Sequence, residues 1–193
     1  MDYTKIKQWL KDNLNEEKYY HSLETAENAL KISDIINYED KDKAYLSALI
    51  HDCAKCIKKD KMFEIASILD FVTEEELSMP KTLHAPVGVE IAQKELFIDD
   101  EEILSAIRFH TVARKNMTKL EMIVFLSDKI REEFGTKYFG KDAFDFIKEY
   151  GIETAMLKAI QNGIEYLQEK KAKPCSLTLE ALEYFKDKIN NCI

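Results

Sequence analysis

Residues 153–169 read ETAMLKAIQNGIEYLQE, and this stretch carries the clearest structural signal in the chain. Four apolar residues recur in it at steps of three and four and therefore share one helix face: Leu157, Ile160, Ile164 and Leu167. Helical spacing of this kind dominates the sequence, and no segment of useful length alternates as a strand would. Five Gly and three Pro are also too few for a fold built from many hairpins. The sequence predicts an all-α fold.

Helices are expected over residues 3–14, 17–37, 41–56, 60–70, 85–97, 100–110, 119–132, 141–149, 152–170 and 177–191. The segments that begin at Thr73, Asp99 and Thr118 each resemble a capping box at a helix start. Residues 1–193 contain no repeat and no long polar linker, so we expect a single domain. The residues suited to chemistry lie within 15–135, and we expect residues 140–193 to form a C-terminal helical cap.

Composition narrows the class of protein. Of the 193 residues, 46% are hydrophobic and 33% are charged, as expected for a soluble globular chain with a sizeable core. The net charge of −8 disfavours a general nucleic-acid surface, although a few local cations would still allow a polyphosphate substrate. The longest apolar run, Met122–Leu126, is too short to span a bilayer, and the N-terminal residues lack a signal-peptide pattern. We expect a cytoplasmic protein that binds neither nucleic acid nor membrane.

The four cysteines do not indicate a metal site. Cys53 and Cys56 have C-x-x-C spacing, but a structural zinc would require a second close pair, and Cys175 and Cys192 lie far apart in the sequence. A thioredoxin-like site would require a βαβ setting. We interpret the cysteines as small packing residues.

The histidines and two aspartates carry a stronger signal. The chain has four histidines, at positions 21, 51, 84 and 110. A single histidine on an apolar face is more often a core residue, but His51 is followed directly by Asp52, and Asp128 continues the apolar stripe of Leu120 and Val124. An unpaired buried carboxylate is costly, and a divalent metal held by imidazoles would supply its partner.

These residues belong to a recognisable series of motifs. The order His21, His51-Asp52 and Asp128 resembles the metal-binding signature of the HD superfamily of metal-dependent phosphohydrolases, an all-helical family. More narrowly, the chain resembles the YqeK branch, the symmetrical diadenosine tetraphosphate hydrolases, over about residues 15–180. The resemblance is carried by residues 18–21 (KYYH), 48–55 (ALIHDCAK), 83–88 (LHAPVG), 106–111 (AIRFHT) and 125–130 (FLSDKI).

The resemblance implies a metal site and a reaction. His21, His51, Asp52 and Asp128 would hold a divalent ion, iron in this family, although such ligands also suit manganese, nickel or zinc. His84 and His110 would either hold a second ion bridged through Asp52 or face the phosphates; we favour the phosphates, because no other carboxylate is evident for a second ion. The reaction would be the symmetrical cleavage of diadenosine tetraphosphate to two ADP.

The residues implied to contact substrate form a larger set. Asp52 would orient or deprotonate water, Lys55 would neutralise phosphate charge, and both histidines would assist proton transfer, so the expected catalytic residues are Asp52, Lys55, His84 and His110. The expected substrate-binding residues are these four together with Lys18, Cys53, Ala54, Thr111, Arg114, Lys171 and Lys173.

Several stretches depart from the family pattern. His110-Thr111-Val112-Ala113-Arg114-Lys115 stands where the family usually has His-Thr-Thr-Gly-Arg-Pro. Residues 130–134 (IREEF) replace the family's Ile-Glu-Pro-x-Arg, and residues 174–176 (PCS) replace its Ile-His-Pro. Several of these three stretches are expected to meet the nucleotide. Two alternatives therefore stay open: an HD phosphohydrolase for another nucleotide, or a nucleotide-binding regulator with slow turnover. A homodimer is also compatible with the sequence.

Overall fold

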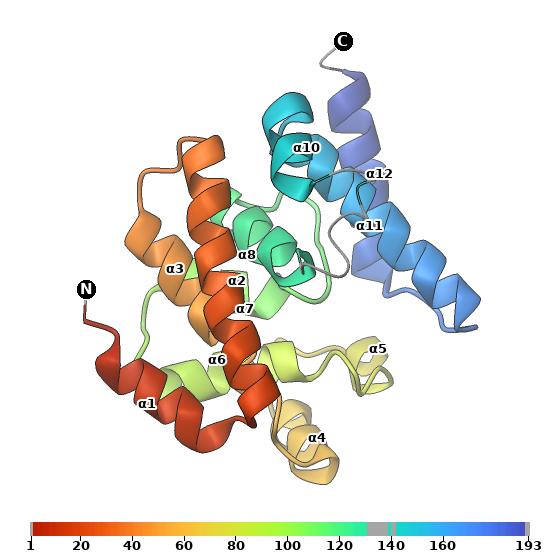
Figure 1. Cartoon of the computed structure of the whole chain (residues 1–193). Helices are drawn as coiled ribbons and strands as arrows, with labels where there is room; N and C mark the ends of the chain where they lie inside the picture. Colours follow the sequence, from red (N-terminus) through yellow and green to blue (C-terminus); the bar gives the residue numbers. More distant parts are fainter. Residues whose placement is uncertain (1, 131–138, 140–141, 192–193) are drawn as a thin grey trace.

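The computed structural model describes residues 2–130, 139 and 142–191, and every regular element within them is a helix (Figure 1). The predicted all-α fold is therefore confirmed. The helices are α1 Thr4–Asn13, α2 Glu16–Ile35, α3 Lys41–Ile50, α4 Lys59–Ser67, α5 Glu74–Leu77, α6 His84–Lys94, α7 Glu101–Phe109, α8 Lys119–Lys129, α10 Ala143–Tyr150, α11 Ile152–Glu169 and α12 Ser176–Asn190.

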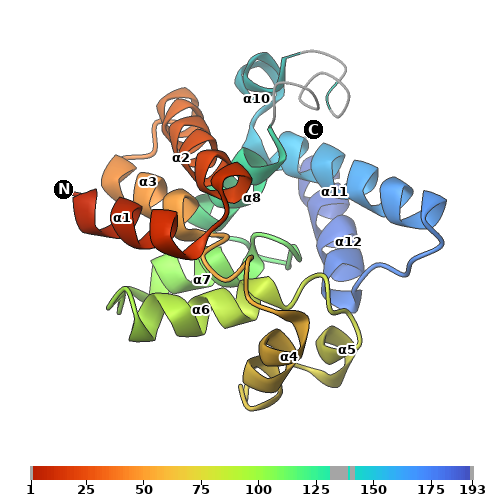
Figure 2. The same cartoon turned by 60° about the horizontal axis from the view of Figure 1, so that its bottom comes forward.

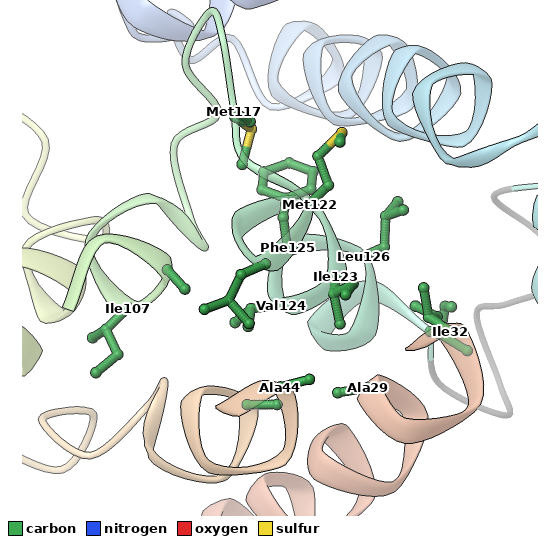
Figure 3. Close-up of a cluster of buried hydrophobic side chains, with 14 of the residues drawn as sticks. Ala29, Ile32, Ala44, Ile107, Met117, Met122, Ile123, Val124, Phe125 and Leu126 are labelled. Carbon is green, nitrogen blue, oxygen red and sulfur yellow. The ribbon is translucent and has the colours of Figure 1, made fainter. Parts of the chain in front are cut away.

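Helix α8 lies at the centre of the molecule. The Thr118 hydroxyl accepts the backbone N–H of Glu121 while the Glu121 carboxylate accepts that of Thr118, so the predicted capping box is formed. Every residue from Leu120 to Ser127 is buried, because α8 contacts α2, α3, α7 and α11. Figure 3 shows Ile123, Val124 and Leu126 of this helix among side chains of its neighbours. Burying one such large side chain stabilises the fold by roughly 2 kcal/mol.

The remaining helices extend this centre in two directions (Figure 2). Helix α4 packs on α6 through a small second cluster that includes Ala54, Met62 and Leu83, and α5 contacts α4. On the other side α11 contacts α8, α10 and α12, and α10 contacts α2. The main hydrophobic cluster runs without a break from Leu10 in α1 to Phe185 in α12.

Three expectations about helices are wrong. The expected capping box at Asp99 is replaced by Asp100, whose carboxylate caps α7 by accepting the N–H groups of Glu102 and Ile103. The helix expected over 41–56 ends at Ile50, because the His51 ring takes the Ala48 carbonyl, which would otherwise accept the next helical N–H. Residues 51–57 form successive tight turns instead, with Cys53, Lys55 and Ile57 each donating to the carbonyl three residues before. The short α5 was missed as a helix, although its capping box at Thr73 was predicted. Residues 131, 132 and 141 of the expected helices lie outside the described residues.

The cysteines are largely as interpreted. Cys53 and Cys175 are buried free thiols, while Cys56 is exposed and therefore not a packing residue. Cys192 lies outside the described residues. None of the described helices has the length and apolarity that crossing a membrane would require.

Candidate metal centre

Six side chains from five helices and one turn meet at the centre of the fold. His21 lies on α2, His51 ends α3, Asp52 begins the turn after it, and Asp128 lies in the last turn of α8. His84 is the first residue of α6, and His110 is the residue that ends α7. All are buried except Asp128, which is partly exposed. The fold thus brings together every residue that the sequence predicted as a metal ligand, although up to 107 positions separate them.

Each of the two carboxylates lies close to its own set of histidines, and His51 is common to both sets. Asp128 Oδ1 lies 2.9 Å from His21 Nε2 and 3.4 Å from His51 Nε2. Asp52 Oδ1 lies 3.2 Å from His84 Nε2 and 3.4 Å from His110 Nε2, while its Oδ2 lies 3.7 Å from His51 Nε2. His51 therefore stands between both carboxylates. Two overlapping groups have ligand atoms close enough to hold a metal: His21, His51 and Asp128, and His51, Asp52 and His110.

Backbone carbonyls fix the orientation of three of the rings. The Nδ1 atoms of His51, His84 and His110 lie 2.6, 2.9 and 2.7 Å from the carbonyl oxygens of the residues three positions before them. A carbonyl only accepts, so each Nδ1 is the donor and each Nε2 can present its lone pair to the site. This arrangement of a ligand imidazole held from its other nitrogen is typical of protein metal centres.

Two buried atoms of the cluster lack a hydrogen-bond partner among the described residues. His51 Nε2 and Asp52 Oδ1 are buried and make no hydrogen bond within the described part of the chain. His51 Nε2 faces oxygens of Asp52 and Asp128, and Asp52 Oδ1 faces the Nε2 atoms of His84 and His110 together with the Lys55 ammonium at 3.4 Å. A metal ion among these atoms would give both orphaned atoms a partner. Four imidazole nitrogens and two carboxylates are a suitable donor set for a first-row divalent ion. The residues present therefore fit a metal.

The charged neighbours and the burial of the cluster shift the pKa values of Asp52, Asp128 and His110. Burial alone would raise the pKa of Asp52, but the imidazoles of His51, His110 and His84 hold it well below its usual range. Burial also opposes ionisation of Asp128, yet Lys129 and the neighbouring histidines keep its pKa well below its usual range. Both carboxylates are therefore ionised at neutral pH. Burial lowers the pKa of His110 to about 4, so this ring is neutral there.

Three polar residues border the cluster. Lys55 Nζ lies 2.8 Å from His84 Nε2 and 3.4 Å from Asp52 Oδ1, and the Thr111 hydroxyl lies 3.1 Å from His84 Nε2. Lys129 Nζ lies 3.5 Å from Asp128 Oδ2 and donates to the His110 carbonyl. The two ammonium groups balance the two carboxylates. A bound divalent ion would consequently leave the site with excess positive charge, which suits a polyanionic substrate.

Other predicted substrate residues lie in different surroundings. The Cys53 thiol donates to the Gly88 carbonyl, and Ala54 is fully buried beside Met62 and Leu83. Lys18 pairs with Glu17 one helical turn before His21. Lys171 and Lys173 are exposed in the loop between α11 and α12.

Arg114 is directed away from the histidine cluster. Its guanidinium pairs with the buried carboxylate of Glu121 at 2.7 Å and lies over the Phe109 ring. It borders a cavity of about 390 Å³ that is lined equally by apolar and by polar or charged residues and includes none of the six cluster residues. Arg108, in the same cavity, pairs with Glu76. Both guanidinium groups are already neutralised.

Sequence reasoning missed Lys129 and Thr25. Lys129 follows Asp128 directly, and its ammonium lies 3.8 Å from the centre of the Phe125 ring. Thr25 lies one helical turn after His21, and its hydroxyl is 3.5 Å from His21 Nδ1. The sequence signal for Lys129 was its place directly after a ligand, and that for Thr25 was its place one helical turn from a ligand.

Comparisons with known proteins agree with this geometry. The family model described as HD domain matches residues 19–133. The symmetrical bis(5'-nucleosyl)-tetraphosphatase of Staphylococcus aureus is 31% identical over 96% of this chain and 95% of its own length. The protein of the same name from Bacillus subtilis is 31% identical over 83% of this chain and 85% of its own.

A solved structure has the same fold. A Clostridium acetobutylicum protein described as a predicted HD superfamily hydrolase involved in NAD metabolism matches with a TM-score of 0.87 and 33% identity, covering 97% of this chain and 98% of that one.

Proposed function

This chain belongs to the HD domain family, and on that premise we propose that it is a metal-dependent phosphohydrolase that cleaves diadenosine tetraphosphate symmetrically into two ADP. The observation that carries the proposal is the convergence of His21, His51, Asp52 and Asp128, the first three of them buried, beside the Lys55 ammonium. It occurs in a chain that matches symmetrical tetraphosphatases over most of its length.

We assign the metal to His21, His51, Asp52 and Asp128. Oxygen and nitrogen ligands without a thiolate suit iron, and we propose iron as the ion. When bound, such an ion lowers the pKa of water and polarises a phosphoryl oxygen. One oxygen of Asp52 faces His51 and the other faces His84 and His110. Asp52 therefore links the metal ligands to the two histidines assigned to the phosphates.

His84 and His110 are assigned to the phosphates. Both Nε2 atoms lie on the Asp52 Oδ1 side of the cluster, 3.2 Å from one another. Lys55 and Thr111 each lie within hydrogen-bonding distance of His84 Nε2, and both groups can donate to a phosphate oxygen instead. Lys55 neutralises phosphate charge, and a neutral histidine with its Nε2 lone pair free assists proton transfer by accepting a proton from the attacking water. Attack by water breaks one phosphorus–oxygen bond, and the displaced oxygen leaves with the second ADP.

The remaining predicted contacts stay part of the proposal as substrate-binding residues. Lys18 lies one helical turn before His21, and Cys53 and Ala54 directly follow Asp52 along the chain. Lys171 and Lys173 are solvent-exposed in the loop between α11 and α12. Arg114 would have to leave Glu121 to reach a phosphate, so we expect it to contribute least.

Activity measurements test this function. Protein purified without oxygen and carrying its full metal complement should convert diadenosine tetraphosphate to ADP over many turnovers. A protein that hydrolyses another nucleotide instead would be an HD phosphohydrolase with a different substrate. Tight ADP binding with no repeated turnover would identify a regulator.

A further inference from the structure

A second cavity opens directly beside the metal centre. It has a volume of about 360 Å³ and lies between the turns after α3, the start of α4 and the segment that leads into α6. Lys55 and His84 belong both to its wall and to the histidine cluster, and their side chains touch at 2.8 Å. The cavity therefore adjoins the place where phosphate chemistry would occur.

The charge of this cavity differs from that of the protein. Three lysines line it, Lys55, Lys59 and Lys81, and no carboxylate does so among the described residues. The whole chain has a net charge of −8. Lys59 and Lys81 are exposed and have no ion-pair partner in the part of the chain that the structure covers. Their ammonium groups are thus available to an anion.

The floor of the cavity is apolar. Ile57, Met62 and Leu83 line it, and Met62 and Leu83 are anchored in the buried cluster between α4 and α6. A pocket of roughly 300 Å³ or more, with an apolar wall and a few placed charges, is suited to a small ligand. A nucleotide combines an apolar base with anionic phosphates and matches both features.

The symmetry of the substrate requires two binding arms. Central cleavage of diadenosine tetraphosphate leaves one ADP unit on each side of the metal, so each half needs its own place in the protein. The cavity at Arg108 and Arg114 is a weaker candidate for either half, because Glu76 and Glu121 already neutralise its guanidinium groups.

We infer that the cavity at Lys55, Lys59 and Lys81 is the binding subsite for one ADP half of the substrate. Lys59 and Lys81 bind its phosphates beyond the reach of the metal, and the apolar floor receives its nucleoside. This inference rests on the proposed function, since it assigns one arm of that substrate.

The test replaces the two unpaired lysines by a neutral polar residue. The pocket variant is Lys59→Gln with Lys81→Gln. The matched control is Lys58→Gln with Lys61→Gln, which removes the same charge from two exposed lysines near the start of α4 that do not line the cavity. Because two solvent-exposed charge contacts are lost, the pocket variant should raise KM for diadenosine tetraphosphate about tenfold. Its kcat and metal content should be unchanged, and the control should retain the KM of the unaltered enzyme.

The outcomes separate the subsite from the function. An active enzyme whose KM is unchanged in the pocket variant, or raised equally in the control, overturns the subsite and leaves the function standing. If the unaltered enzyme does not cleave the substrate, the function fails, and equilibrium dialysis with ADP judges the subsite independently. Two ADP bound per chain, reduced to one in the pocket variant, would support it; unchanged ADP binding would overturn it.

Discussion

Lys55 offers the sharpest test of how the site handles phosphate. Its ammonium lies 3.4 Å from Asp52 Oδ1 and 2.8 Å from His84 Nε2, and its side chain is 33% exposed. Lys55→Ala removes the positive charge but none of the groups assigned to the metal. The bound ion should therefore stay in place while the phosphates lose a counter-charge.

The expected loss follows from the distances and the exposure. Two unit charges about 4 Å apart interact by about 4 kcal/mol at the effective dielectric constant of a site near the surface. Partial exposure of Lys55 screens part of this energy, so a loss of about 2.7 kcal/mol in transition-state stabilisation is expected, or about 100-fold in kcat/KM. Because the ammonium contacts both bound substrate and transition state, KM should rise and kcat should fall.

Steady-state kinetics with diadenosine tetraphosphate measure this effect, and elemental analysis checks that the metal is retained. Lys186→Ala is the control, because this lysine lies on α12 and pairs with Glu183 at 2.8 Å. The control should match the unaltered enzyme. Full activity of Lys55→Ala would refute the phosphate contact and identify Lys55 as a structural partner of Asp52 alone.

Three further predictions concern the metal ligands and their neighbours. Asp52→Ala should bind the metal at least about 100-fold more weakly and should lose hydrolysis. Cys53→Ala is the control and should keep both the metal and the activity. Full metal content in the Asp52 variant, measured by elemental analysis, would contradict the assignment. His84→Ala and His110→Ala should each lower kcat and should each retain one ion per chain. Two ions in the unaltered protein and one in each variant would instead show that these histidines hold a second metal. Burial depresses the pKa of His110 to about 4, so the unfolded chain binds a proton there at higher pH than the folded chain does. In the metal-free protein the neutral His110 ring therefore favours the folded state fully above about pH 6.5. As the pH falls toward 4, the free energy of unfolding should drop by up to about 3 kcal/mol. Urea unfolding of His110→Ala should show a weaker dependence of this free energy on pH between these values.

The sequence predicted the composition of the site better than its local geometry. The apolar stripe that Asp128 continues already indicated that α8 directs this carboxylate inward, and the structure places it in the cluster. The doublet His51-Asp52 was expected on a continuous helix, where Lys55 would share a face with His51. The helix ends at Ile50, and Lys55 reaches the site from a turn.

The reasons for these differences lie in contacts between distant segments. The hydrogen bond of His51 Nδ1 to Ala48 is local, but it stabilises the site only because Asp52 and Asp128 face the other ring nitrogen. Arg114 follows the motif at His110, yet its guanidinium is held by Glu121 at the start of α8. Such pairings depend on how the helices pack, which the spacing of apolar residues does not specify.

Product analysis tests the central claim most directly. The unaltered protein, purified without oxygen and with its metal content measured, is incubated with diadenosine tetraphosphate, and the nucleotides are separated by anion-exchange chromatography. Symmetrical hydrolysis at the centre described here predicts ADP as the sole nucleotide product, lost when the ion is removed by a chelator and restored when it is returned. Formation of AMP and ATP, or no product from metal-loaded protein, would contradict it.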